Sequence, residues 1–232
     1  MKDLIILQYQ YLIDHSSPDP LDDLSLAARA LDAQLGYLKQ YDFNVISLSS
    51  VVQCLWNDLR LPESPIVLTF DGGYMEHYTH AFPVLQRYDL PATCFLPTAH
   101  IGKFSEWDAE DGHAVAPLMG WDQIYAMKPY DIDFGSLTAN HIALDEVEDG
   151  IALAELTASK ELLQSKLGGA VYSMAYPWNR MTRETTLLVS MAGYMGGCGS
   201  SNVEESVFNL WRVPVSPQMP LADFKALVNN NT

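Results

Sequence analysis

Short apolar runs alternate along the chain with longer segments whose apolar residues recur at helical spacing. The apolar runs, each typical of a buried strand, cover residues 4–9, 43–48, 65–70, 92–96, 131–134, 171–176, 194–198 and 208–215. The segments with helical spacing cover residues 24–41, 49–59, 76–88, 121–127, 145–167, 182–191 and 221–228. Strands that alternate with helices in this way are typical of a parallel sheet with helical crossovers.

The number of these units favours a sheet that closes on itself. Seven or eight strand–helix units within 232 residues predict a distorted (β/α) barrel. An open, doubly wound sheet is the alternative. We find no internal repeat and no dividing linker, so we expect one domain over residues 1–232. Residues 101–120 show no regular period and are expected to form a loop insertion.

Polar residues follow the apolar runs at the places where a barrel carries its functional site. Asp71 follows the third run, residues 136–141 follow the fifth, residues 176–178 end the sixth, and residues 8–10 end the first. Active sites of such barrels lie at the carboxyl ends of the strands. We therefore expect these four stretches to meet on one rim.

The charge and the cysteine content narrow the classes of partner and cofactor. The formal net charge is −16 and the pI is about 4.5. A polyanion is repelled by nucleic acid and by anionic lipid, so we expect neither as a partner. The three cysteines include no CxxC pair of the kind that holds structural zinc, and buried free thiols are expected at Cys54 and Cys94.

The beginning of the chain predicts a strand rather than a targeting segment. Its apolar run at residues 4–7 is short, whereas the core of a signal peptide needs ~7–15 apolar residues. No run reaches the ~18 apolar residues that a membrane-spanning helix requires. A cytoplasmic protein is expected, unless an export signal lies outside the given sequence.

Several segments, in order, carry a resemblance to a known family. They are TFDGGY at residues 69–74, residues 81–97, WDQI at 121–124, FGSLTANHIAL at 134–144, the Ser-Lys pair at 159–160, MAYPWN at 174–179 and LWRVPVS at 210–216. Over residues 4–216 the chain resembles the polysaccharide deacetylase (NodB-like) family of carbohydrate esterases, and within it the poly-N-acetylglucosamine deacetylase branch. The resemblance implies a distorted (β/α)7 barrel and a glycan with N-acetyl groups as the partner.

The family's chemistry is metal-assisted amide hydrolysis, in which one Asp is the base and a second Asp and two His hold zinc or a similar ion. By resemblance, Asp71 is the base and His141 the second metal-binding histidine, so these are the candidate catalytic residues. Gly72 and Leu137 stand where the other two ligands belong, and Gln10 stands where this branch has its acid. One imidazole does not hold a catalytic zinc, which takes three protein ligands. No metal or other cofactor is therefore expected at the family's site.

The alternative to a chain without a metal is a relocated metal site, in which other residues supply the ligands. His77 and His80 are spaced to share one face of a helix; the plain interpretation is an exposed first turn. The insertion offers Asp108, Glu110, Asp111 and His113. Folded over the rim, the insertion would bring these side chains toward Asp71 and His141, whereas the plain interpretation is a solvated acidic loop.

Aromatic residues near the predicted rim suggest where a sugar would bind. Sugar rings have apolar faces that stack on aromatic side chains, although the same side chains also serve as core residues. The candidate substrate-binding residues are Tyr74, Tyr176, Pro177, Trp178 and Arg212, and Trp121 is a further aromatic residue near the rim. By resemblance, Arg212 ties the closing strand to a rim carboxylate.

Three hypotheses of function follow. The first is a family member that has lost zinc-dependent de-N-acetylation, a pseudoenzyme that binds a glycan or supports polysaccharide synthesis. The second is an active deacetylase or related amide hydrolase, with a relocated metal or with a metal-independent mechanism that uses Asp71 and His141. The third is an interaction domain without affinity for sugars. The glycan's identity and the oligomeric state stay open.

Overall fold

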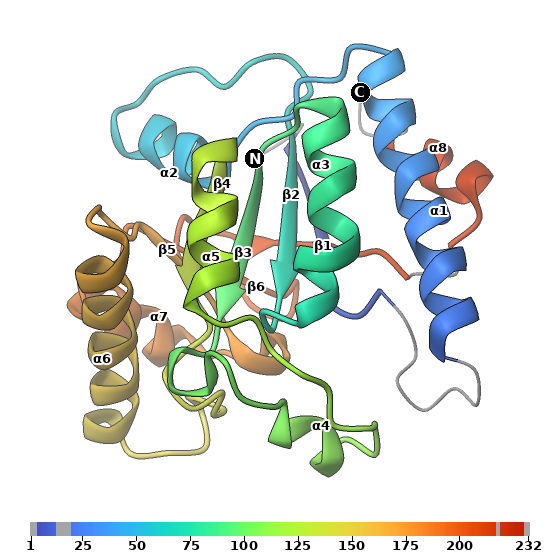
Figure 1. Cartoon of the computed structure of the whole chain (residues 1–232). Helices are drawn as coiled ribbons and strands as arrows, with labels where there is room; N and C mark the ends of the chain where they lie inside the picture. The colour runs from blue at the N-terminus through green and yellow to red at the C-terminus, as the bar shows by residue number, and fades with distance from the viewer. Residues whose placement is uncertain (1–3, 13–19, 217–218, 230–232) are drawn as a thin grey trace.

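The computed structural model describes residues 4–12, 20–216 and 219–229, and its strands form an eight-stranded parallel sheet (Figure 1). The strands are β1 (Ile5–Tyr9), β2 (Ile66–Asp71), β3 (Ala92–Leu96), β4 (Ile132–Ser136), β5 (Ser173–Ala175), β6 (Gly196–Gly199), β7 (Leu210–Trp211) and β8 (Val213–Pro214). The helices are α1 (Pro20–Gln40), α2 (Leu48–Trp56), α3 (Phe82–Tyr88), α4 (Glu106–Glu110), α5 (Trp121–Met127), α6 (Asp149–Leu167), α7 (Arg183–Met191) and α8 (Leu221–Asn229). The short helical turns are His77–Ala81, Thr98–His100, Lys128–Tyr130 and Pro177–Asn179.

The sheet closes through the short segment that contains β7 and β8. These two strands are separated only by Arg212; β7 pairs with β6, and β8 pairs with β1 at the other edge of the sheet. The result is a nearly closed, distorted barrel, which confirms the predicted (β/α)7 fold, and the open-sheet alternative is wrong. The predicted strand at residues 208–215 is divided at Arg212 because the chain passes there from one edge of the sheet to the other.

The prediction of a strand at residues 43–48 is wrong. In that stretch Val45 makes an isolated strand-like pairing with Ile66. The pairing extends no further because β3 takes the same edge of β2 from Thr69 onward and α2 begins at Leu48. α2 begins directly afterwards, one residue before the predicted segment 49–59, and is capped by Ser47, whose hydroxyl accepts a backbone hydrogen bond at 3.1 Å.

α2 covers the end of the barrel at which the strands begin, opposite to α4 (Figure 1). Its Val51 and Val52 belong to an inner apolar cluster with Ile6 of β1 and Phe95 of β3. The alternate residues of the strands, such as Leu7, belong to an outer cluster that packs against the flanking helices. Both faces of each central strand are therefore buried, as the continuous apolar runs predicted.

The 101–120 insertion is an ordered part of the barrel's carboxyl-end face. It contains α4, which lies beyond the arrowheads of the strands (Figure 1). The backbone N–H of Met119 donates to the carbonyl of Gly73 at 2.8 Å, and this bond ties the insertion to the turn after β2. Trp107 and Asp108 of α4 are buried. The insertion therefore contributes side chains to the rim.

Two further expectations concern membranes and thiols. Among the described residues, none of the helices combines the length and the apolar character that crossing a bilayer requires. The cysteines are free thiols. The prediction of burial is confirmed for Cys94 and is wrong for Cys54, which is partly exposed on α2.

The barrel interior leads to a prediction at Gly135 in β4. An added Cβ would lie 2.5 Å from the ring of Phe95 and 2.9 Å from the carbonyl oxygen of Ser173. Overpacking of this kind costs about 1–3 kcal/mol, so we expect Gly135→Ala to lower the free energy of unfolding by that amount. The measurement is urea unfolding followed by circular dichroism.

The matched control is Gly150→Ala in the first turn of α6, where an added Cβ meets nothing within 4 Å. This change is expected to be neutral or to stabilise by up to about 1 kcal/mol, because alanine loses less backbone freedom than glycine. Equal destabilisation by the two substitutions would contradict the packing described for the interior.

Candidate functional site

The centre of the rim is a closed ring of four hydrogen-bonded side chains. Asp71, the last residue of β2, accepts from Gln8 Nε2 at 2.8 Å through Oδ2 and from Arg212 Nη1 at 2.7 Å through Oδ1. Asn179 donates to Gln8 Oε1 at 3.1 Å and accepts from Arg212 Nη2 at 2.8 Å. Both oxygens of the Asp71 carboxylate are therefore engaged by neighbouring side chains.

Arg212 makes the contact to a rim carboxylate that the family resemblance implied. Its side chain is fully buried and forms an ion pair with Asp71. Burial alone would lower the pKa of the guanidinium, but the negative charge of Asp71 outweighs this effect and raises the pKa above its ordinary value. The pair thus stays charged inside the barrel and fixes the closing segment to β2.

The position next to Asp71 has no room for a ligand side chain. Gly72 adopts φ +97°, and a Cβ on it would lie 2.3 Å from Cε2 of Tyr74. The phenol of Tyr74 donates to Asp108 Oδ1 at 2.9 Å, and the phenol of Tyr11 donates to the same oxygen at 2.8 Å. The insertion therefore holds the Tyr74 ring in the space that a side chain at residue 72 would enter.

Leu137 also belongs to packing rather than to a metal site. It is 2% exposed and lies in the inner cluster with Ile6, Val67 and Phe95. Among the described residues, no three Cys, His, Asp or Glu side chains form a group that could hold a metal ion. At the ligand positions that the family resemblance assigns, Gly72 and Leu137 carry no donor atom, so the residues present do not fit the family's zinc site.

His141, the remaining ligand position, is an uncharged imidazole between two indoles. Its ring stacks on Trp107 at 4.3 Å between centroids and meets the edge of Trp178 at 4.4 Å. Burial lowers the pKa of His141 to about 4, although the negative charge of Asp71 acts in the opposite direction. The ring is therefore neutral at neutral pH, and its Nδ1 has no hydrogen-bond partner among the described residues.

Several of the proposed replacement ligands make other contacts. His77 Nε2 donates to the carbonyl of Gln10 at 2.7 Å, and His80 is hydrogen-bonded to its neighbour Thr79. The exposed first turn expected at residues 76–80 is wrong in part, because Glu76 and His77 are buried. The solvated loop is likewise wrong for Asp108, which is 0% exposed and binds two tyrosines.

The candidate sugar-binding aromatics fall into two groups. Tyr74 and Tyr176 are buried, and the phenol of Tyr176 donates to the carbonyl of Phe208 at 2.8 Å. Pro177 is also buried, and Trp121 stacks on its neighbour Tyr125. By contrast, Trp178 is 38% exposed, and its Nε1 donates to Asp111 of the insertion at 2.7 Å. Trp178 thus offers an aromatic surface that a sugar can reach.

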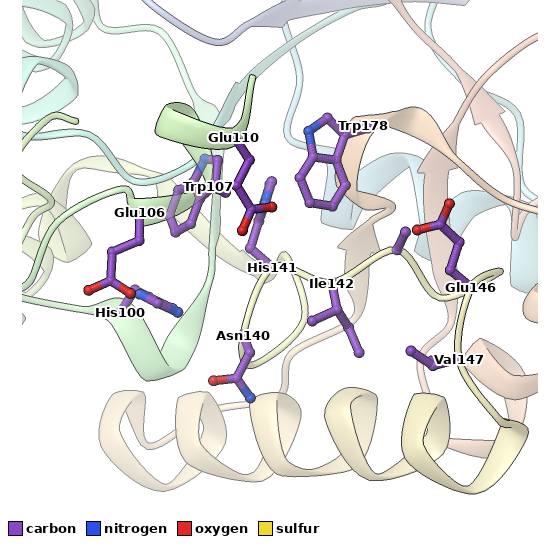
Figure 2. A pocket seen from close by; sticks show the side chains of 11 residues that line it. His100, Glu106, Trp107, Glu110, Asn140, His141, Ile142, Glu146, Val147 and Trp178 are labelled. Atoms are coloured by element: carbon purple, nitrogen blue, oxygen red, sulfur yellow. The ribbon is translucent and has the colours of Figure 1, made fainter. Parts of the chain in front are cut away.

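Two adjoining cavities open at this rim. The smaller, of about 230 Å³, is lined by Gln8, Gln10, Asp71, Gly72, Tyr74, Trp107, Leu137, His141, Tyr176, Trp178 and Asn179. The larger, of about 550 Å³, is lined by His100, Glu106, Trp107, Glu110, Asn140, His141, Ile142, Ala143, Glu146, Val147 and Trp178 (Figure 2). Three residues line both cavities: Trp107, His141 and Trp178.

The sequence alone did not indicate a role for Trp107 or Asn179 at this rim. For Trp107, the available signal was a tryptophan within an acidic, irregular segment.

Comparison with known proteins now decides the family. The sequence profile of the family described as polysaccharide deacetylase matches residues 58–197. The chain belongs to the polysaccharide deacetylase family. Family membership, which the motifs predicted, is thereby confirmed, whereas the profile alone says nothing about whether this member is active.

Relatives of this deacetylase family member include both named enzymes and solved structures. It is 24% identical to YxkH of Bacillus subtilis strain 168, named a polysaccharide deacetylase, over 90% of this chain and 72% of that protein. It is 21% identical to the poly-β-1,6-N-acetyl-D-glucosamine N-deacetylase of Staphylococcus aureus, over 78% of this chain but only 63% of that enzyme.

Two solved structures are similar over almost the whole chain. The deacetylase PplD of Streptococcus pyogenes, in complex with acetate, has a TM-score of 0.76 and 25% identity, with 96% of both chains covered. IcaB of Ammonifex degensii has a TM-score of 0.80 and 21% identity, covering 100% of this chain and 97% of that one. The likeness extends through both ends of the barrel, including the segment that closes it.

The buried ion pair leads to a prediction for Asp71 and Arg212. Removal of one partner leaves the other charge buried and unpaired, so Asp71→Asn and Arg212→Met are each expected to lower the free energy of unfolding by about 3–5 kcal/mol. The double variant is expected to recover part of this loss, because neither charge is then present. Urea unfolding of the four proteins measures the coupling, and strictly additive losses would argue against the pair.

A second prediction tests whether Tyr74 fills the space beside Gly72. Gly72→Ala and Gly112→Ala both place alanine at positive φ, but an added Cβ at Gly112 meets nothing within 4 Å. Gly72→Ala is therefore expected to destabilise by about 1–3 kcal/mol more than Gly112→Ala, because it alone meets the tyrosine ring. In a Tyr74→Ala background this excess should disappear; persistence of the excess would show that another group causes it.

Proposed function

We propose that this member of the polysaccharide deacetylase family binds an N-acetylated glycan at the rim and has lost zinc-dependent de-N-acetylation. The observation that carries the proposal is the lack of a donor at two ligand positions that the resemblance assigns: a side chain at Gly72 would meet Tyr74, and Leu137 is an aliphatic residue packed in the inner cluster. Without these donors, a zinc ion would have at most one of the usual three protein ligands.

The remaining polar groups supply little of the lost chemistry. Asp71 is hydrogen-bonded through both oxygens to Gln8 and Arg212. General acid–base catalysis contributes typically ~10²–10⁴-fold, which is far below what the hydrolysis of an amide requires. Gln10, at the position of the family's acid, has no titratable group. The Asp71 ring therefore serves to close the barrel and to shape the floor of the smaller cavity.

The proposal of a glycan ligand rests on the shape and lining of the rim. The exposed indole of Trp178 stands at the junction of the two cavities, and a sugar ring presents an apolar face to such a side chain. One relative, the S. aureus enzyme, is named a poly-β-1,6-N-acetyl-D-glucosamine N-deacetylase. We infer the same class of polymer for this chain, and a single domain that includes the insertion.

The second candidate is a metal-independent hydrolase. Its support is that Asp71 and His141 line the same cavity of about 230 Å³. His141, with a pKa lowered to about 4 by burial, would be unprotonated at neutral pH and so would act as a base rather than as the acid for a leaving amine. The measurements of amine release and sugar binding described next distinguish this candidate from the first.

The test uses the purified chain and a β-1,6-linked N-acetylglucosamine tetrasaccharide. We expect no stoichiometric zinc by elemental analysis and no release of free amine, with or without added zinc. We expect binding of the sugar by isothermal titration calorimetry. Replacement of Trp178 by alanine should weaken this binding about fivefold or more, since aromatic stacking contributes on the order of 1 kcal/mol or above.

Trp211→Ala is the matched control, because Trp211 is an exposed tryptophan of β7 that lies outside both cavities. This substitution is expected to leave the binding of the sugar unchanged. Release of amine that Asp71→Asn abolishes would overturn the proposal in favour of an active hydrolase. Absence of binding, with a folded protein, would leave an interaction domain without affinity for this sugar.

A further inference from the structure

The larger cavity contains two carboxylates without a counter-charge. Glu106 and Glu110 belong to α4, and no hydrogen bond or ion pair of either carboxylate occurs within the described parts of the chain. Figure 2 shows the Glu110 carboxylate directed into the space between Trp107 and Trp178. Glu146, which lines the same cavity, is by contrast paired with Arg180 at 2.6 Å.

The floor of this space is a second, independent feature. His141 is 6% exposed and lines the cavity, and its Nδ1 has no hydrogen-bond partner among the described residues. A polar side chain this deeply buried without a partner lacks a compensating bond, which a ligand can supply.

The lining favours an organic cation over a metal ion. No Lys or Arg is among the residues that line the cavity, and no described group of three His, Cys, Asp or Glu residues could hold a metal. A protonated primary amine needs a different environment: hydrogen-bond acceptors that carry negative charge, and the faces of aromatic rings. Glu110 provides the negatively charged acceptor, and Trp178 and Trp107 provide the aromatic faces.

We propose that this cavity binds the free ammonium group of a glucosamine residue in a partly de-N-acetylated glycan. The inference rests on the proposed glycan-binding function and names the form of the glycan. The reaction class that supplies such a ligand is hydrolysis of the N-acetyl amide, which exposes the amine. The chain would thus recognise what active relatives produce. Its net charge of −16 attracts a cationic polymer over longer distances.

The test compares two β-1,6-linked tetrasaccharides, one fully N-acetylated and one fully de-N-acetylated, by isothermal titration calorimetry. A hydrogen bond to a charged group contributes about 1.5–3 kcal/mol, so the de-N-acetylated sugar is expected to bind at least about tenfold more tightly at neutral pH. The preference should disappear at a pH at which the sugar amines have lost their protons.

The variant Glu110→Gln keeps the shape of the side chain and removes its charge; it should reduce the preference, while binding of the acetylated sugar changes little. Glu161→Gln, an exposed carboxylate on α6 outside the cavity, is the matched control for net charge. An equal loss of the preference for the de-N-acetylated sugar in these two variants would overturn the proposal, because long-range charge alone would then explain that preference.

The remaining outcomes separate this inference from the proposed function. Equal or tighter binding of the acetylated sugar would overturn the inference and leave glycan binding intact. Failure of both sugars to bind would remove the proposed function together with the inference. Binding of the de-N-acetylated sugar that Trp178→Ala leaves unchanged would place the amine elsewhere on the acidic surface and would also overturn the assignment.

Discussion

The ion pair between Arg212 and Asp71 is the constraint on which the barrel and its rim both depend. Arg212 is the one residue between β7 and β8, and its buried guanidinium reaches the carboxylate at the end of β2. Two charges removed from water are tolerated only when they are paired and further hydrogen-bonded, and Gln8 and Asn179 complete that shell. Closure of the sheet and the position of Asp71 are thus two results of the same interaction.

The insertion connects this frame to the altered site. Asp108 accepts hydrogen bonds from Tyr11 and Tyr74, and the Tyr74 ring occupies the space beside Gly72. Glycine at residue 72 and the buried carboxylate at residue 108 therefore depend on each other: a larger side chain at 72 would displace the ring that Asp108 holds. The insertion packs Trp107, Ala116 and Leu118 into one cluster with Tyr74 and, through Trp107, lines the larger cavity.

These features describe a polysaccharide deacetylase fold in which contacts among polar and aromatic side chains shape the rim. Asp71 is used for closure, His141 lies uncharged between two indoles, and the carboxylates of α4 face an aromatic space. Recognition of a sugar needs such a surface but no bound metal. The acidic charge of the chain, which excludes polyanionic partners, agrees with a ligand that carries amines.

The sequence by itself determined the family, the parallel barrel and the positions of Asp71, His141 and Arg212, because strand period, strand ends and motif order are local properties. The tertiary structure decided what these residues contact. The strand expected at residues 43–48 is limited to one pairing, of Val45 with Ile66, because β3 takes the same edge of β2 from Thr69 onward, which sequence alone does not reveal. Likewise, Asp108 looked like part of a solvated loop, and only folding of the insertion across the rim buries it against Tyr11 and Tyr74. Contacts between segments so far apart in the chain depend on closure of the barrel, and no local pattern encodes them.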